Sequence, residues 1–297
     1  MTSAPGPDAR SVPAEGADDV ELIDCGDGRR LERFGQVILD RPAPAVAHVP
    51  RRDEGAWRGA DARYDRDAGW TGPRPPAGPW TVRLGGIALA CRLSGEGGVG
   101  CYPEHAALWR TLAAPLADRP GARVLNAFGH TGGLSIAAAA AGASVTHVDS
   151  SRAAVAAARA NAALNGLADA PIRWIVDDAR AYVAREVRRG RRYDLVVLDP
   201  PSYGHGGAGR PWRIADDLPD LAASALGLLG GPGAALVVTL HSTGWTEERL
   251  AGLLMDVGPT GGPGVGPRAD ETWLSTLVAR SGAILPTGVG ARWRAAR

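Results

Sequence analysis

Residues 123–133 read RVLNAFGHTGG, a short aliphatic run that ends in a glycine-rich turn. Four further aliphatic runs predict strands at 144–148, 172–176, 195–198 and 234–240. The stretches between them predict helices that begin near Gly133, Arg152, Asp178, Ile214 and Thr246. Strands that are apolar on both faces and alternate with helices indicate a parallel sheet covered on both sides. The sequence therefore predicts an α/β fold with a Rossmann-like, doubly wound, mostly parallel sheet.

The end of the chain predicts an antiparallel C-terminal hairpin. Residues 271–279 and 283–286 are the expected strands, and Ser281-Gly282 between them is a turn signal. A parallel sheet that closes with such a hairpin is the methyltransferase variant of the doubly wound fold, and a dehydrogenase does not normally end this way.

The chain before the sheet predicts a small β-rich N-terminal region. We expect a disordered tail at 1–18, a β-meander within 21–39 and mostly irregular structure at 41–79. Gly85-Gly86 predicts a hairpin between 80–84 and 87–93. Residues 103–116 predict a helix with Pro103 in its first turn. The expected division is therefore a β-rich region at 19–100 and a cofactor-binding domain at 101–297.

Composition limits the possible partners and compartments. The 33 basic and 32 acidic residues leave a net charge of +1, which excludes a strong overall field for nucleic acid but permits a local patch. Three cysteines, Cys25, Cys91 and Cys101, favour reduced thiols in a cytoplasmic protein. The first residues lack the apolar stretch of a signal peptide, and no run is long enough for a membrane helix.

The turns after the first two strands predict part of a nucleoside-cofactor site. Gly129, Gly132 and Gly133 allow close approach of a ligand, and the next helix offers its N-terminus to a carboxylate. Asp149 follows the second strand, where an acid accepts hydrogen bonds from ribose hydroxyls. The alternatives are an ordinary βα turn and a helix cap. Either serine of Ser150-Ser151 can provide that cap, which would leave Asp149 free.

The turns after the third and fourth strands complete the predicted site. One carboxylate of Asp177-Asp178, which precede Ala179, is a candidate acceptor for an adenine amino group or, alternatively, a helix cap. The run Asp199-Pro200-Pro201-Ser202-Tyr203 is the most specific signal in the chain. Its prolines fix the backbone and leave carbonyls as acceptors toward the cleft. With Asp199 they would hold an amino group, and Tyr203 would stack on a flat base; a rigid turn is the alternative.

With these motifs, the chain resembles class I S-adenosylmethionine-dependent methyltransferases of the bacterial large-subunit (23S) ribosomal RNA family. The resemblance rests on these stretches: GDGRRLERFG at 26–35, GCYPEH at 100–105, TGG at 131–133, DSS at 149–151, WIVDDA at 174–179, DPPSYG at 199–204, PTG at 286–288 and Arg292-Trp293. It implies S-adenosyl-L-methionine as the cofactor. It assigns the ribose to Asp149, the adenine amino group to Asp178, and the methionine pocket to Phe128, Thr131 and Gly132, with Glu104 covering the cofactor.

The predicted site thus has catalytic and cofactor-binding residues and no metal. The catalytic candidates are Asp199, Pro200 and Tyr203. The cofactor candidates are Glu104, Phe128, Thr131, Gly132, Gly133, Asp149, Ser150, Asp178, Ala179 and Asp199. Cytosine-C5 enzymes of the family use a cysteine after strand four or five, but here Ser202 and the segment 238–242 follow those strands, and no cysteine lies beyond Cys101. Carbon methylation through a covalent adduct is therefore disfavoured.

We expect methylation of a base nitrogen in RNA, with ribosomal RNA as the partner. A small-molecule methyltransferase, or an RNA-binding protein that lost catalysis, are the alternatives. Two arginine-rich segments are candidate phosphate contacts: the end of the third helix, which includes Arg185 and Arg188, and residues 51–70, where Trp57, Tyr64 and Trp70 interleave with arginines. The alternative for the first segment is a solvent-exposed helix end, and the alternative for the second is a loop packed on the surface of the domain. His205 and Trp212 flank a glycine-rich loop that would cover substrate, and a lone His241 is more often structural.

Overall fold

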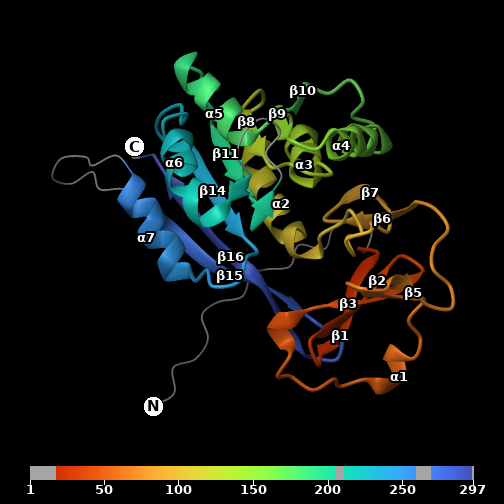
Figure 1. The fold of residues 1–297 in the computed structure, drawn as a ribbon. Helices are drawn as coiled ribbons and strands as arrows, with labels where there is room; N and C mark the ends of the chain where they lie inside the picture. The colour runs from red at the N-terminus through yellow and green to blue at the C-terminus, as the bar shows by residue number, and fades with distance from the viewer. Residues whose placement is uncertain (1–17, 205–210, 259–268, 296–297) are drawn as a thin grey trace.

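The computed structural model describes residues 18–204, 211–258 and 269–295. Its central sheet has seven strands in the order β10-β9-β8-β11-β14-β16-β15 (Figure 1). The first five of these strands run parallel to one another. β16 runs antiparallel to its neighbours β14 and β15. Their bounds are β8 Arg123–Ala127, β9 Ser144–Asp149, β10 Ile172–Val176, β11 Leu195–Leu198, β14 Ala235–Leu240, β15 Ala269–Val278 and β16 Ile284–Arg294. The Rossmann-like fold with its closing hairpin is confirmed.

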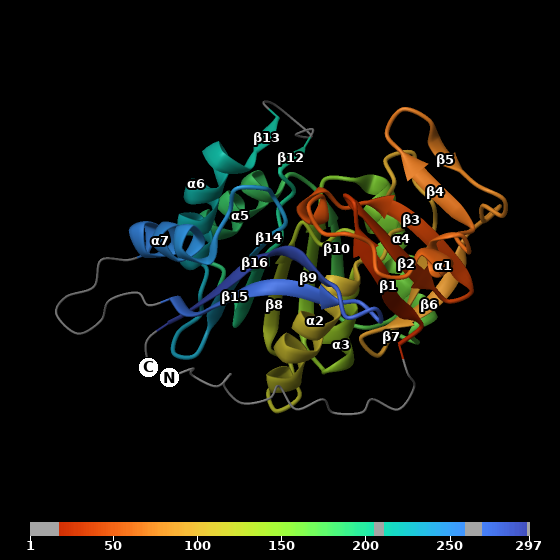
Figure 2. The ribbon, with the colours of Figure 1, turned by 90° about the horizontal axis from the view of Figure 1, so that it is seen from below.

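Helices cover both faces of this sheet (Figures 1 and 2). Side chains alternate along each strand: Val124 packs with α2, α3 and α4 on one face, and Leu125 packs with α5, α6 and α7 on the other. Both faces of the parallel strands are therefore buried, which explains their unbroken apolar sequences. The helix bounds are α2 Ala106–Ala113, α3 Gly133–Ala140, α4 Arg152–Leu164, α5 Ala179–Arg188, α6 Ile214–Leu226 and α7 Glu247–Val257.

The region before α2 forms two smaller sheets. Five strands run in the order β1-β2-β3-β4-β5, and β6 pairs with β7 around Gly85-Gly86, whose φ values of 61° and 87° suit a tight hairpin turn. The strands are β1 Val20–Gly26, β2 Arg29–Phe34, β3 Val37–Pro42, β4 Ala62–Asp65, β5 Gly69–Thr71, β6 Trp80–Leu84 and β7 Ile87–Cys91. Asn161 of α4 and its C-cap Asn165 accept hydrogen bonds from the backbone of β7, so this hairpin packs on α4.

The prediction of mostly irregular structure at 41–79 holds for the larger part of this segment, but it omitted several short elements. This segment contains β4 and β5, the short helix α1 (Glu54–Trp57) and a 3-10 turn η1 (Pro44–Val46). β4 pairs in parallel with β3, and Arg29 joins them by bonding Asp40 and the Tyr64 carbonyl. Partners distant in sequence thus supply the order that the local composition does not reveal.

Two other predicted boundaries also differ from the structure. The helix at 103–116 is divided into a 3-10 turn η2 (Pro103–His105), α2 and a second turn η3 (Ala114–Leu116), with Pro103 in the first turn as predicted. The last strand continues to Arg294 because β14 pairs along its length.

Two short strands, β12 Tyr203–Gly204 and β13 Trp212–Arg213, pair beside the cleft. The predicted tail at 1–18 lies almost wholly outside the described residues, as does His205. Among the described helices, none combines the length and apolar character needed to cross a bilayer.

Asp24 links the N-terminal sheet to the C-terminal hairpin. Its fully buried carboxylate accepts hydrogen bonds from the Arg52 N–H at 2.9 Å, the Trp57 indole at 2.8 Å and the Ser281 hydroxyl at 2.6 Å. Burial opposes its ionisation, but these donors outweigh burial and lower the pKa of Asp24. One carboxylate thus holds the loop before α1 and the hairpin tip against β1.

Asp24→Ala should lower the free energy of unfolding by about 1–3 kcal/mol, because buried donors lose their acceptor. Urea unfolding at neutral pH measures this loss. Glu21→Ala is the control, since it removes a surface partner of Arg33 and should cost at most about 1 kcal/mol. Equal small losses in both variants would contradict the linking role of Asp24.

The buried side chain of His147 packs against the turn after β8. Its Nδ1 contacts the Ser135 hydroxyl at 3.0 Å, and that hydroxyl accepts a hydrogen bond from the Asn126 amide. A Cβ on Gly129 would lie 2.5 Å from the His147 ring, so only glycine fits at that position. Burial lowers the pKa of His147 to about 4, with a smaller contribution from His130. The imidazole is therefore neutral in the folded protein.

His147 should make stability depend on pH. Because its folded pKa lies below the unfolded value of about 6.5, its contribution is complete above pH 6.5 and is lost as pH falls toward 4. Between pH 8 and pH 5, the wild type should lose about 2 kcal/mol more stability than His147→Gln. Chemical unfolding at several pH values tests this, and parallel curves for the two proteins would refute it.

Candidate active site

A cavity of about 450 Å³ lies at the carboxyl ends of the parallel strands. The turns after β8, β9, β11 and β14 line it, together with residues 102–109. Among the predicted residues, its lining includes Glu104, Phe128, Thr131, Gly133, Asp149, Ser150, Asp199 and Pro200. A smaller cavity shares Phe128, Asp149, Ser150 and Pro201 with it and adds Asp178 and Ala179. The structure thus brings the four strand ends to one place.

Two predicted residues are outside the lining of both cavities. Gly132 caps α3 with φ at 89°, and a Cβ there would lie 2.8 Å from Ala158, so this glycine serves backbone geometry and helix packing. Tyr203 lies in β12 with 54% of its surface exposed, beyond the cavity wall. Trp212, which the sequence placed in a covering loop, is instead buried and packs on Phe128 at 5.1 Å between ring centres.

The turn after β8 is held by Asp149 from the neighbouring strand. Phe128 and His130 adopt positive φ values of 59° and 45°, so the backbone curls under the cavity. Asp149 accepts the His130 N–H at 2.9 Å and the Ser151 N–H at 2.8 Å. Ser151 caps α4, as one alternative predicted, so Asp149 is not the helix cap, although both of its carboxylate oxygens accept backbone donors. Each carboxylate oxygen accepts one backbone donor and keeps one further acceptor position.

The acids after β10 serve mainly as structural groups. Asp178 caps α5 by accepting from the Arg180 and Ala181 amides, and the Arg180 guanidinium binds the same carboxylate at 2.7 Å. Asp177 pairs with Arg185. The helix-cap interpretation is therefore confirmed for Asp178, although this residue also lines the smaller cavity.

The turn after β11 presents Asp199 to the main cavity. The Thr239 hydroxyl donates to Asp199 Oδ1 at 2.7 Å. Burial opposes ionisation, but His105 and His241 outweigh it and hold the pKa of Asp199 at about 2. The expectation that the proline carbonyls point into the cleft was wrong for Pro201, whose carbonyl accepts the Trp212 indole N–H at 2.6 Å. Trp212 thus fixes the rigid turn from the side.

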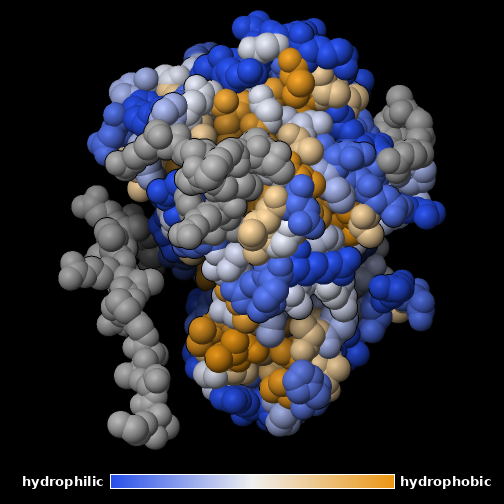
Figure 3. Space-filling view, turned by 90° about the vertical axis from the view of Figure 1, so that its left-hand side faces the viewer, coloured by the Kyte–Doolittle hydropathy of each residue, from blue (hydrophilic) through white to orange (hydrophobic). Residues whose placement is uncertain are grey.

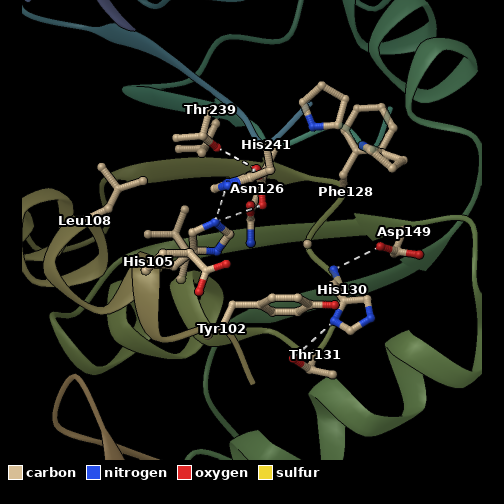
Figure 4. Close-up of a pocket in the computed structure, with 18 of the residues that line it drawn as sticks. Tyr102, His105, Leu108, Asn126, Phe128, His130, Thr131, Asp149, Thr239 and His241 are labelled. Carbon is tan, nitrogen blue, oxygen red and sulfur yellow. Dashed lines mark hydrogen bonds and ion pairs between the residues drawn. The ribbon is translucent and has the colours of Figure 1, made fainter. Parts of the chain in front are cut away.

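Two histidines that were not among the predicted site residues, His105 and His241, lie beside Asp199. His241 Nε2 lies 3.3 Å from Asp199 Oδ1 and 2.7 Å from His105 Nε2. Burial lowers the pKa of His241, but Asp199 outweighs burial and raises it to about 9. Two signals were available in the sequence: His241 directly follows β14, and His105 ends the GCYPEH motif at 100–105. Figure 4 shows the two rings turned toward each other, with Asp149 beside His130 across the cavity.

Glu104 completes the acidic lining from the N-terminal side. Its Oε2 is buried and has no hydrogen-bond partner among the described residues. Burial raises the pKa of this carboxyl, but Arg30 from β2 and His105 outweigh burial and keep it below its usual value. Three carboxylates, those of Glu104, Asp149 and Asp199, therefore face one cavity.

Cys101 is buried, as are the other two free cysteines. A hydrogen bond with Cys91 and burial raise the pKa of the Cys101 thiol well above its usual value, and this residue does not line either cavity. Neither property suits a nucleophile.

Several known proteins are similar to this chain in sequence and in fold. The profile of the S-adenosylmethionine-dependent methyltransferase family matches residues 63–237. The crystal structure of a SAM-dependent methyltransferase from Agrobacterium tumefaciens is 35% identical, with a TM-score of 0.85 over 95% of this chain and 92% of that one. A Streptococcus mutans structure with a TM-score of 0.72, covering 93% of this chain and 75% of that one, is 18% identical and supports the fold alone.

Curated relatives carry the name ribosomal RNA large subunit methyltransferase I. The Klebsiella pneumoniae protein is 29% identical over 58% of this chain and 43% of its own length. The Aeromonas salmonicida protein is 36% identical over 43% of this chain and 32% of its own length. The matched part is thus less than half of each relative. On the profile match and the Agrobacterium likeness, the chain belongs to the S-adenosylmethionine-dependent methyltransferase family.

Proposed function

We propose that this protein transfers a methyl group from S-adenosylmethionine to a base nitrogen in RNA, with ribosomal RNA as the substrate. The observation that carries the proposal is the convergence of four strand ends on one cavity lined by three carboxylates. The names of the curated relatives support the substrate class. The buried free cysteines are compatible with a reducing compartment, so we place the protein in the cytoplasm.

The cavity suits this cofactor chemically. S-adenosylmethionine carries a cationic sulfonium and an ammonium group, and the unpartnered Glu104 Oε2 offers an acceptor of opposite charge. Asp149 has acceptor capacity left for the ribose hydroxyls, and Ser150 lies beside it. Phe128 and Ala179 provide an apolar wall for adenine in the smaller cavity. Thr131, Gly132 and Gly133 form the helix start that would receive the methionine carboxylate.

When bound, the cofactor supplies an already activated methyl group, so alignment is the main task of the protein. Asp199 would accept a hydrogen bond from the base nitrogen that receives the methyl group, and Pro200 keeps this turn rigid. Tyr203, exposed beyond the cavity, would stack on the target base. We further propose residues 101–297 as the catalytic domain and residues 19–100 as an accessory region that contributes Arg30 behind Glu104.

One predicted RNA contact does not fit the structure. Trp57 and Tyr64 in the arginine-rich segment at 51–70 are buried, and both donate their polar hydrogens to protein acceptors. Arg51 lies on the Trp57 ring at 4.0 Å. These aromatic rings are therefore structural and unavailable for stacking on bases. The arginines at the end of α5 remain the better candidate for phosphate contact.

Asp149→Ala should weaken S-adenosylmethionine binding about 10- to 100-fold, because hydrogen bonds to a charged group are lost. Titration calorimetry on the full chain measures this affinity. Asp169→Ala is the matched control, since that acid is exposed on the loop after α4 and should leave affinity unchanged. If Asp149→Ala bound S-adenosylmethionine with wild-type affinity, Asp149 would not be the residue that binds the ribose.

Labelled cofactor and undermodified ribosomal RNA should give labelled RNA, and Asp199→Ala should slow transfer by about 100-fold or more because the acceptor is no longer aligned. Mass spectrometry of the digested nucleosides then identifies the methylated atom. Binding of RNA should weaken steeply with salt. Cofactor binding without transfer to any RNA would reject the RNA assignment and favour a small-molecule acceptor.

A further inference from the structure

Three potential metal ligands meet in the wall of the main cavity. His105 Nε2 lies 3.6 Å from Asp199 Oδ2, His241 Nε2 lies 3.3 Å from Asp199 Oδ1, and the two Nε2 atoms are 2.7 Å apart. The ligand atoms of the three residues all lie within 4.8 Å of one another. The residues come from the turn before α2 and from the ends of β11 and β14. Only the tertiary fold brings them together (Figure 4).

The hydrogen bond of His241 to the backbone determines which atom faces this cluster. His241 Nδ1 lies 2.7 Å from the Thr287 carbonyl, which can only accept, so Nδ1 carries the hydrogen. In the neutral imidazole, Nε2 then presents its electron pair toward His105 and Asp199. At 3.3 Å from the Asp199 carboxylate, this nitrogen faces it across a positive charge, which is either the proton of an imidazolium or a metal ion that displaces that proton.

The surrounding contacts hold the cluster in place. Thr239 donates to Asp199 Oδ1, and Thr287 orients His241, as outer partners do around metal-bound carboxylates and imidazoles. Gly288 allows the close approach of β16, because a Cβ there would lie 2.3 Å from the Leu240 carbonyl and 2.8 Å from His241 Nδ1. The His105 ring lies beside Trp109, at 6.2 Å between ring centres.

We propose that His105, Asp199 and His241 form a binding site for a first-row divalent cation such as Zn²⁺, Co²⁺ or Ni²⁺. Bond lengths of about 2.1 Å place neighbouring ligand atoms about 3.0–3.4 Å apart. The 3.3 Å between His241 and Asp199 fits this range, while the two imidazoles, now 2.7 Å apart, would separate by a few tenths of an ångström (about 0.3 Å or more) to admit the ion. Two imidazoles and one carboxylate favour these ions over Mg²⁺ and Ca²⁺, which prefer oxygen ligands.

The three ligands leave coordination positions open toward the cavity. The side chains of His105, Asp199 and His241 are 13%, 25% and 29% exposed, so a cation can reach them. A bound cation would hold an oxygen or nitrogen of the acceptor through the metal in place of a direct bond to Asp199, and it would make that group more acidic. The site shares Asp199 with the proposed function, but binding of the ion requires neither cofactor nor RNA and can be measured separately from methyl transfer.

Co²⁺ is the probe, because its absorption in the visible range reports coordination directly. Untagged, chelator-treated full-length protein, without cofactor or substrate, should bind one equivalent of Co²⁺ and develop these bands. His105→Ala and His241→Ala should each weaken binding more than about 10-fold, and the double variant should abolish it. His130→Ala is the matched control, since His130 lines the same cavity outside the cluster and should retain binding.

Circular dichroism on every variant separates loss of a ligand from loss of fold. The proposal is overturned if folded wild-type protein binds no Co²⁺, which would mean that protons alone fill the cluster. It is also overturned if the double histidine variant binds Co²⁺ as tightly as wild type. Because neither result involves methyl transfer, failure of this proposal is distinct from failure of the proposed function.

Discussion

The fixed position of the Asp199 carboxylate is the constraint on which the rest of the site depends. A rigid proline turn follows Asp199 as the chain leaves the sheet. Trp212 of β13 holds this turn, and Thr239 and His241 at the end of β14 contact the carboxylate. These contacts place an ionised acid where four strand ends meet. Groups that would bind ribose, adenine and acceptor therefore lie at fixed distances from one another without a rearrangement of the backbone.

The N-terminal region is part of this arrangement. Buried residues of β2, β3, β4, β6 and β7 share one core with α2, α3 and the near face of the large sheet. Arg30 stabilises the charge of Glu104 in the cavity wall, and Asp24 ties the same sheet to the tip of the β15–β16 hairpin. The face over α6 and α7 is different in character: apolar groups there are separated by polar surface (Figure 3).

The sequence predicted the central sheet well, because strands buried on both faces must be apolar throughout and glycines mark the turns that follow them. It also located Asp149 and Asp199, since each comes directly after such a strand. It failed for β4, whose order depends on pairing with β3. It also missed the cluster around Asp199, because His105 and His241 are far apart in sequence and meet only when the turn η2 lies beside the end of β14. Pro201 shows a further limit: its carbonyl would be free by local chemistry, but a distant indole occupies it.

A crystal structure of the full chain with S-adenosylhomocysteine is the most direct test of the central claim. The account predicts the ribose hydroxyls on Asp149, the adenine beside Phe128 and Ala179, and the sulfur facing Asp199 across the main cavity. A ligand bound elsewhere, or one whose sulfur points away from Asp199, would contradict it.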